Sequence, residues 1–200
     1  MAKPGPATIL EEDLAFAFDA SWQVCSHWDS EPVRLALLSQ ASGSHGVDLL
    51  GLREGPTGEL YLIEVKDYRT SEKQRSTREK LAEEGDPLAD IVAGKVRDTV
   101  AGLVGAARVD RDQLWGACVK ALIEREIWVV LWIEHAGLDV GSSTRKNRAK
   151  TSAIPILRRL KQRCRWLSAQ VMVCSRSQNL VPGLTVLSVP AAARTRGRRP

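Results

Sequence analysis

The sequence predicts an α/β fold with a mixed sheet, and three observations carry that prediction. Two apolar runs within 46–69 flank a Gly-Pro-Thr-Gly turn at 55–58, which is typical of a β-hairpin. From Pro87, apolar residues recur at spacings of three and four, which indicates a long amphipathic helix. The apolar run 127–133 is too short to span a bilayer and indicates a buried strand. A hairpin followed by a helical crossover argues against a purely parallel, doubly wound sheet, so we expect a mixed sheet flanked by helices.

Further elements follow from the same periodicities. Thr8 is expected to cap a helix that begins near Ile9, with Glu11 as its capping-box partner. The apolar stripe of that helix is Leu10, Leu14, Ala17 and Phe18. Residues 33–38 fit either a short strand or a turn of helix. We also expect helices at 111–123 and 156–167, strands at 171–174 and 184–189, and a solvated excursion over the highly charged stretch 70–86.

The bulk composition favours one domain with a polyanionic partner. A chain of 200 residues with 44% hydrophobic composition fits a single core, expected over 1–190, followed by a basic, disordered tail at 191–200. Lys and Arg number 29 against 24 Asp and Glu, which gives a net charge of +5. Because no secretory signal or long apolar run is visible, we expect a soluble cytoplasmic protein without membrane contact. The four cysteines lack the spacing of a zinc site or a disulfide framework.

Three charged residues interrupt the apolar strands of the hairpin. Asp48 lies within the first strand, and Glu64 and Lys66 lie within the second. Residues two apart on a strand share a face, so Glu64 and Lys66 point the same way. A three-residue loop at 56–58, closed by a left-handed glycine, would set Asp48 opposite Lys66 on that face. A two-residue loop would turn Asp48 to the other face, so the turn decides whether the three residues meet.

Two carboxylates in a half-buried site repel each other unless a cation neutralises them. Mg²⁺ prefers oxygen ligands and keeps waters that can attack phosphorus. Asp48 and Glu64 are therefore predicted metal ligands, and the backbone carbonyl of Val65 is a further one. Lys66 is placed to orient or deprotonate the attacking water, or to stabilise charge on the reacting phosphate.

The run Gly46-Val47-Asp48, followed after the turn by Glu64-Val65-Lys66, resembles the core motif of the PD-(D/E)xK nuclease superfamily. That superfamily includes restriction endonucleases and archaeal Holliday junction resolvases. The likeness covers 9–133, and Val47 stands where the motif's name has proline. The resemblance implies a restriction-endonuclease-like core with the order αβββαβ. It also implies a Mg²⁺-dependent (endo)deoxyribonuclease, in which Mn²⁺ substitutes for Mg²⁺.

The resemblance suggests two further residues at the site. Many members place a glutamate on the first helix near the metal, and Glu11 is the candidate here. Its capping-box role is an alternative of equal weight, and Glu12 points largely away on the expected helix. Lys95 lies near the edge of the apolar face of the long helix, where relatives place a Gln or Lys that faces the site. A surface lysine that only snorkels is the alternative for Lys95.

Basic residues outside this motif are candidates for binding nucleic acid, DNA being favoured. They are Arg69 after the hairpin and the basic loop residues Arg145, Lys146, Arg148 and Lys150. His45, three residues before Asp48, is a candidate phosphate contact or base. The chain shows no recognition domain, so we expect targeting by a partner protein, by a homodimer or by DNA structure. A catalytically silent, nucleic-acid-binding or scaffolding subunit is the alternative function.

Overall fold

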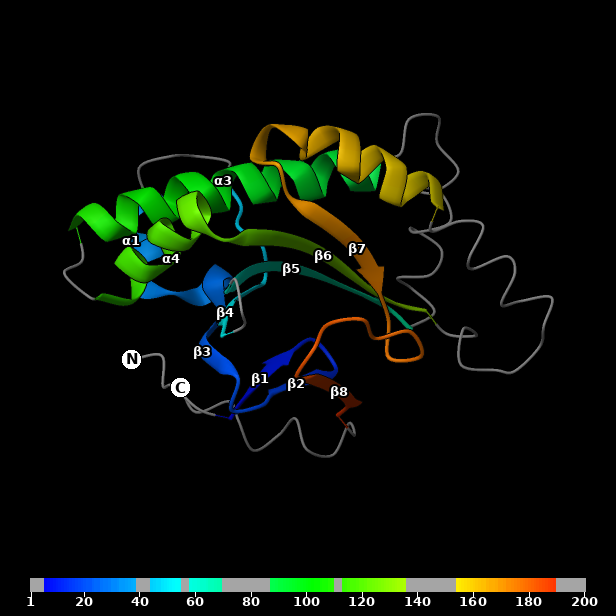
Figure 1. Cartoon of the computed structure of the whole chain (residues 1–200). Coiled ribbons are helices and arrows are strands. Elements are labelled where there is room, and N and C mark those ends of the chain that lie inside the picture. Colours follow the sequence, from blue (N-terminus) through cyan, green and yellow to red (C-terminus); the bar gives the residue numbers. More distant parts are fainter. Residues whose placement is uncertain are drawn as a thin grey trace.

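The structure, a computed structural model, describes residues 6–38, 44–54, 58–69, 87–109, 113–135 and 154–189. Within these residues the chain forms a mixed α/β fold with two sheets, which confirms the predicted fold class (Figure 1). The charged excursion predicted at 70–86, the basic loop at 145–150 and the tail at 191–200 lie outside the described residues.

The larger sheet has five strands in the order β3-β4-β5-β6-β7. Their bounds are Trp22–Ser26, Leu49–Arg53, Glu59–Tyr68, Glu126–His135 and Gln170–Cys174. Strands β3, β4 and β5 run antiparallel, whereas β5, β6 and β7 run parallel. The sheet is therefore mixed, as the hairpin and the helical crossover predicted.

The smaller sheet joins the beginning of the described chain to its end. Its three strands are β1 (Ala7–Glu11), β2 (Leu14–Phe18) and β8 (Leu184–Ser188), and β2 pairs antiparallel with both neighbours. In Figure 1 this sheet lies below the five-stranded sheet, on the face opposite the helices.

The helix predicted from Ile9 is wrong, and β1 and β2 occupy its place. Leu14 and Phe18 of the predicted stripe also fit a period of two, and with Phe16 between them they form a buried row, since Leu14, Phe16 and Phe18 are 0%, 0% and 2% exposed. Leu10 is 61% exposed and faces away from this core. Thr8 and Glu11 therefore form no capping box.

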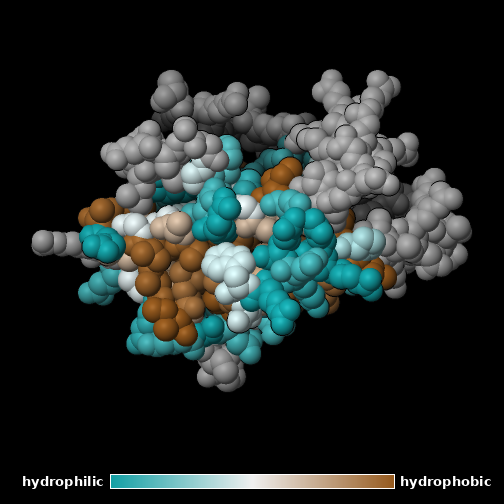
Figure 2. Space-filling model, turned by 90° about the horizontal axis from the view of Figure 1, so that it is seen from above, coloured by the Kyte–Doolittle hydropathy of each residue, from teal (hydrophilic) through white to brown (hydrophobic). Residues whose placement is uncertain are grey.

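Helices cover the other face of the large sheet (Figure 1). They are α1 (Pro32–Leu38), α3 (Pro87–Val109), α4 (Gln113–Glu124) and a helix at 154–163, with 3-10 turns at Trp28–Ser30 and Arg165–Leu167. The predicted helices from Pro87, at 111–123 and at 156–167 are confirmed to within a few residues, and α1 decides the alternative left open at 33–38. Seen from the helix side, hydrophilic areas lie beside a hydrophobic one (Figure 2).

Strand β5 is buried on both faces and separates two apolar cores. Leu60 and Leu62 belong to the core beneath the helices, whereas Tyr61 and Ile63 belong to the core shared with the small sheet. Because successive side chains alternate, Glu64 points toward the helices. A charged side chain thus continues the buried apolar row of β5.

The β4–β5 hairpin keeps the predicted faces but not the predicted register. Arg53 pairs with Glu59 and Leu49 with Ile63, so one further step sets Asp48 opposite Glu64 rather than Lys66. The predicted register is wrong by two residues, because the connection between the paired strands is longer than three. A shift of two preserves the face. Gly58 has φ 64°, which confirms the left-handed glycine.

None of the helices in the described residues is both long enough and apolar enough to cross a membrane.

Gly51 allows the ring of Trp22 to pack against β4. A Cβ at Gly51 would lie 2.4 Å from Trp22 Cζ3, and Trp22 is 1% exposed. We expect Gly51→Ala to lower the free energy of unfolding by about 1–3 kcal/mol, because the ring has to move.

The matched control is Gly116→Ala on α4, where a Cβ meets nothing within 4 Å. We expect this substitution to raise stability by about 0.5–1 kcal/mol. Urea denaturation of both variants measures the two effects, and equal shifts would contradict the packing of Trp22 on Gly51.

Candidate active site

The site lies where β5 meets α3 on the helix side of the large sheet. Glu64 is 0% exposed, and Lys66, two residues further on the same face, is partly exposed. Asp48, which is 7% exposed, immediately precedes β4. The structure thus brings the three predicted residues together, although through a different register from the one expected.

Two lysines converge on one oxygen of Glu64. Lys66 Nζ lies 2.5 Å from Glu64 Oε1, and Lys95 Nζ lies 2.8 Å from the same atom. Lys95 Nζ also lies 3.3 Å from Asp48 Oδ1. Lys95 therefore faces the site, and its predicted contact with nucleic acid stays a prediction.

Asp48 is fixed by the neighbouring strand. The backbone N–H of Val65 donates to Asp48 Oδ2 over 2.7 Å. Lys66 Nζ donates to the carbonyl of Val65 over 3.2 Å. The carbonyl of Val65, predicted as a ligand, is therefore turned toward the same lysine that binds Glu64.

Helix α3 also holds the segment that leads into Asp48. The backbone N–H of Val47 donates to Thr99 Oγ1 over 2.9 Å, and Thr99 is 0% exposed. The N–H of His45 donates to Asp98 Oδ2 over 3.2 Å. Thr99 lies one helical turn after Lys95, so one face of α3 both contacts and positions Asp48.

Glu11 approaches the site from β1 rather than from a helix. Its Oε2 lies 2.5 Å from His27 Nε2, and His27 Nδ1 lies 2.8 Å from Ser30 Oγ. Burial raises the pKa of Glu11, and the Asp48 carboxylate raises it further, so the two acids lie within electrostatic range. Glu12, at φ 51° in the β1–β2 turn, contributes to the raised pKa of Lys66, so both acids border the site.

Electrostatics mark this cluster as costly to bury. Burial raises the pKa of Glu64, the Asp48 carboxylate raises it further, and the charges of Lys66 and Lys95 only partly offset the rise. Burial lowers the pKa of Lys66, but the charge and hydrogen bond of Glu64, together with the charges of Asp48 and Glu12, outweigh it, so the net shift is upward. The cluster therefore favours the charged form of Lys66 but leaves the Glu64 carboxylate short of compensating charge.

The residues present fit a divalent cation. Glu64 Oε2 is buried and has no hydrogen-bond partner among the described residues, so it has an acceptor to offer. Asp48, Glu64 and the Val65 carbonyl would supply oxygen ligands of the kind that Mg²⁺ binds. No group of three or more His, Cys, Asp or Glu side chains in the described residues is arranged to hold a metal. The ligand set suggested here contains only two such side chains, Asp48 and Glu64, and its third member is a backbone carbonyl.

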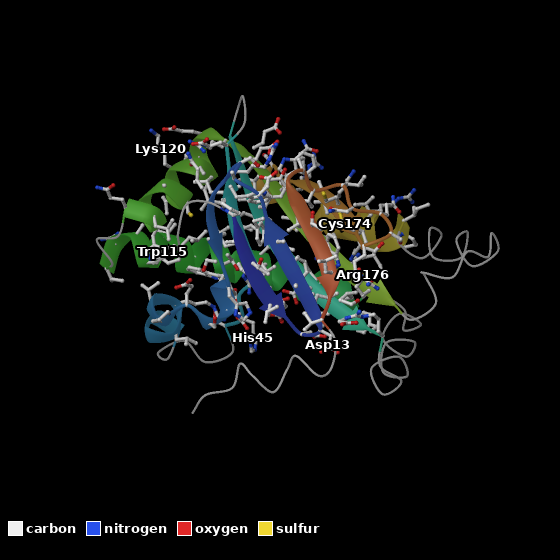
Figure 3. The ribbon with its side chains drawn as sticks, turned by 90° about the horizontal axis from the view of Figure 1, so that it is seen from below. Asp13, His45, Trp115, Lys120, Cys174 and Arg176 are labelled. Atoms are coloured by element: carbon white, nitrogen blue, oxygen red, sulfur yellow. The ribbon has the colours of Figure 1, made fainter. Side chains whose placement is uncertain are left out.

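Arg69 has structural partners. Its guanidinium binds both oxygens of Asp67, donates to the carbonyl of Asp13 over 3.0 Å and contacts Ser188 Oγ at 2.5 Å. These contacts join β5 to the end of the small sheet where Leu14 pairs with Ser188, and Figure 3 shows Asp13 and Arg176 at this end of the molecule. The predicted contact of Arg69 with nucleic acid stays a prediction.

The other predicted site residues are His45 and the four residues of the basic loop. The side chain of His45 is exposed, and Figure 3 shows it at the same lower edge as Asp13. Arg145, Lys146, Arg148 and Lys150 lie outside the described residues. Sequence reasoning missed Thr99, Asp98 and His27. A signal for Thr99 existed, since a hydroxyl four residues from Lys95 shares its helix face.

Comparison with known proteins finds no matching family profile and no matching solved structure. The chain is similar to a cysteine–tRNA ligase of Neisseria meningitidis serogroup A / serotype 4A (strain DSM 15465 / Z2491), with 37% identity over 153 residues. That alignment covers 64% of this chain and 21% of the ligase, so the chain spans about a fifth of its relative's length.

Removing the Thr99 hydroxyl should destabilise the fold through the backbone of Val47. In Thr99→Val the buried N–H of Val47 loses its acceptor, which costs about 1–3 kcal/mol in the free energy of unfolding. Thr99→Ser keeps the oxygen and should cost less. Urea denaturation of the two variants checks this, and a larger loss in the serine variant would contradict the role of the hydroxyl.

Glu64→Gln should change how stability depends on pH. Because the pKa of Glu64 is higher in the folded chain than its ordinary value of 4.5, the folded state holds more protons, and stability falls as pH rises above that value. Without divalent metal, we expect the variant to exceed the wild type at pH 8 by on the order of 1 kcal/mol. The gain should vanish near pH 4.

The control for this measurement is Glu124→Gln, whose side chain is 56% exposed on α4. Thermal or urea unfolding across the pH range should show no comparable pH-dependent gain in this variant. A Glu64→Gln difference that stays constant from pH 4 to pH 8 would argue against a strained carboxylate.

Proposed function

We propose that this chain is a metal-dependent nuclease of the PD-(D/E)xK type that hydrolyses phosphodiester bonds, DNA being the favoured substrate. The observation that carries the proposal is the convergence of Asp48, Glu64 and Lys66 around a buried carboxylate oxygen without a hydrogen-bond partner in the described chain. Restriction, repair and defence are the roles that such an activity would serve.

A purely structural role for the cluster is disfavoured by the free-energy cost of burying its charges. Burying charged groups costs free energy that an apolar residue at the position of Glu64 would avoid. The flanking residues Leu62 and Ile63 are both 0% exposed, so the strand would pack well without the charge. A retained buried charge with a raised pKa is characteristic of functional sites.

Mg²⁺, or Mn²⁺ in its place, would be held by Asp48, Glu64 and the carbonyl of Val65, with Glu11 as a further candidate ligand. When bound, such a cation activates a water and neutralises charge on the phosphate oxygens. Lys66, already 2.5 Å from Glu64, is placed to orient that water or to stabilise charge on the reacting phosphate, because its raised pKa keeps it protonated and unable to accept the water's proton. Lys95 is placed to bind a phosphate oxygen beside Asp48.

The β1–β2 hairpin is a departure from the fold that the resemblance implied. The acid at the site then comes from a strand and its turn, not from a first helix. The electrostatic coupling of Glu11 with Asp48 supports a role for it despite this change of element. A homodimer or a partner protein that directs the chain to its substrate remains part of the proposal.

The test is cleavage of a panel of substrates with Mg²⁺, Mn²⁺ or EDTA. The panel comprises linear duplex, supercoiled plasmid, single strand, branched junction and RNA, with tRNA included because the relative's name specifies a tRNA ligase. We expect metal-dependent cleavage, with DNA preferred. Nucleic-acid binding without cleavage would instead support the silent, scaffolding function.

Site variants make this test specific. We expect Asp48→Ala and Glu64→Ala to lower cleavage by at least about a hundredfold while the fold is retained, because each removes a metal ligand. Lys66→Ala should lose activity and keep metal binding. Glu124→Ala and Lys120→Ala are matched controls, since these two side chains form an exposed pair on α4 outside the site. Wild-type rates in the site variants would overturn the assignment.

A further inference from the structure

The segment 154–167, which forms the helix at 154–163 and the following 3-10 turn, contains no acidic residue. Its basic residues are Arg158, Arg159, Lys161, Arg163 and Arg165. No Asp or Glu follows Asp139 in this sequence, so no neighbouring acid along the chain offsets the charge of the segment. The segment therefore concentrates positive charge on one element of the helical layer.

The helix divides these residues between two faces. Ile156, Leu160 and Cys164 pack into the core and are 5%, 0% and 0% exposed. Residues three and four apart share a helical face, so Arg158, Lys161 and Arg165 form a row on the outward side, where all three are exposed. None of their side chains has an ion pair or hydrogen bond to the part of the chain that the structure describes.

The other two arginines fix the helix against α3. Arg163 Nε lies 2.6 Å from Asp90 Oδ1, and Arg159 Nε lies 3.4 Å from the same atom. Asp90 lies five residues before Lys95 on α3, which is roughly 7.5 Å along the helix axis. The outward row is thus held on the same layer of helices that carries Lys95 over the site (Figure 1).

An aromatic side chain lies at the end of the row. Trp166 is 54% exposed, whereas four of the other five tryptophans are 0–3% exposed and the fifth, Trp128, packs against the core. Exposed aromatic rings beside cations are common on nucleic-acid-binding surfaces, where bases stack on them. Figure 2 shows hydrophilic side chains gathered on this helical face of the molecule.

We infer that the outward row of Arg158, Lys161 and Arg165 binds the phosphate backbone of a nucleic acid. This inference rests on the proposed nuclease function and gives it a second contact surface, apart from the metal site. Rows of unpaired cations gain affinity for a polyanion by releasing its condensed counterions. Contacts of this kind position the substrate and carry no sequence preference.

The test compares two double variants that each remove one arginine and one lysine. Arg158→Gln/Lys161→Gln alters the row, and Arg108→Gln/Lys120→Gln alters exposed positions on α3 and α4. Binding of a labelled DNA duplex is measured by fluorescence anisotropy in EDTA, so that no cleavage intervenes, over a series of salt concentrations. Thermal unfolding confirms that both variants are folded.

We expect the row variant to weaken duplex binding by roughly tenfold or more at 0.1 M salt, and to lower the salt slope by about 1 per charge removed. The control variant should stay within about twofold of the wild type. Equal effects in the two variants, or loss of binding to anionic lipid vesicles but not to DNA, would overturn the inference.

Cleavage assays separate this inference from the nuclease proposal. If the site cuts DNA but the row does not bind it, Asp48→Ala is inactive, and duplex binding by the row variant keeps the wild-type salt dependence. In that case only the inference about the row fails. If the row binds but the site does not cut, the binding difference persists although no variant or wild-type protein cleaves. That outcome supports nucleic-acid binding by the row and overturns the proposed nuclease function.

Discussion

The burial of the Glu64 carboxylate beneath α3 is the constraint on which the site depends. A charge at 0% exposure needs nearby cations, and Lys66 and Lys95 both direct their ammonium groups to its Oε1. Lys95 can do so only because the parallel crossover lays α3 across β5. The position of α3, which follows from the sheet order and the crossover, therefore determines how Glu64 Oε1 is compensated. The other carboxylate oxygen, Oε2, stays available for a cation.

The sequence predicted correctly which side chains share a face of a strand, because buried and exposed residues alternate along it. Glu64 and Lys66 were placed on one face by the period of two alone, and Asp48 joined them although its register was wrong by two residues. An error of one residue would have separated them. The first helix was predicted wrongly because Leu14 and Phe18 satisfy both periods, and a short segment gives too few residues to choose between them.

Contacts between distant elements were beyond the sequence. No residue near Val47 in the sequence predicts that its N–H donates to Thr99, 52 residues later. The pairing of Glu11 with His27 depends on a hairpin that was not predicted. Arg69 was assigned to nucleic acid by its charge, whereas its partners Asp67 and Ser188 show that a basic residue after a strand can equally hold two sheets together.

The pairing of β2 with β8 has a consequence for the order in which the protein is made. Leu14 pairs with Ser188, so the small sheet is complete only after nearly all of the described chain has left the ribosome. Until then, β2, which carries Phe16 and Phe18, lacks one of its two neighbouring strands. The third strand of the small sheet is therefore added only after the other described elements have been made, and the carbonyl of Asp13 then accepts a hydrogen bond from the N–H of Val189.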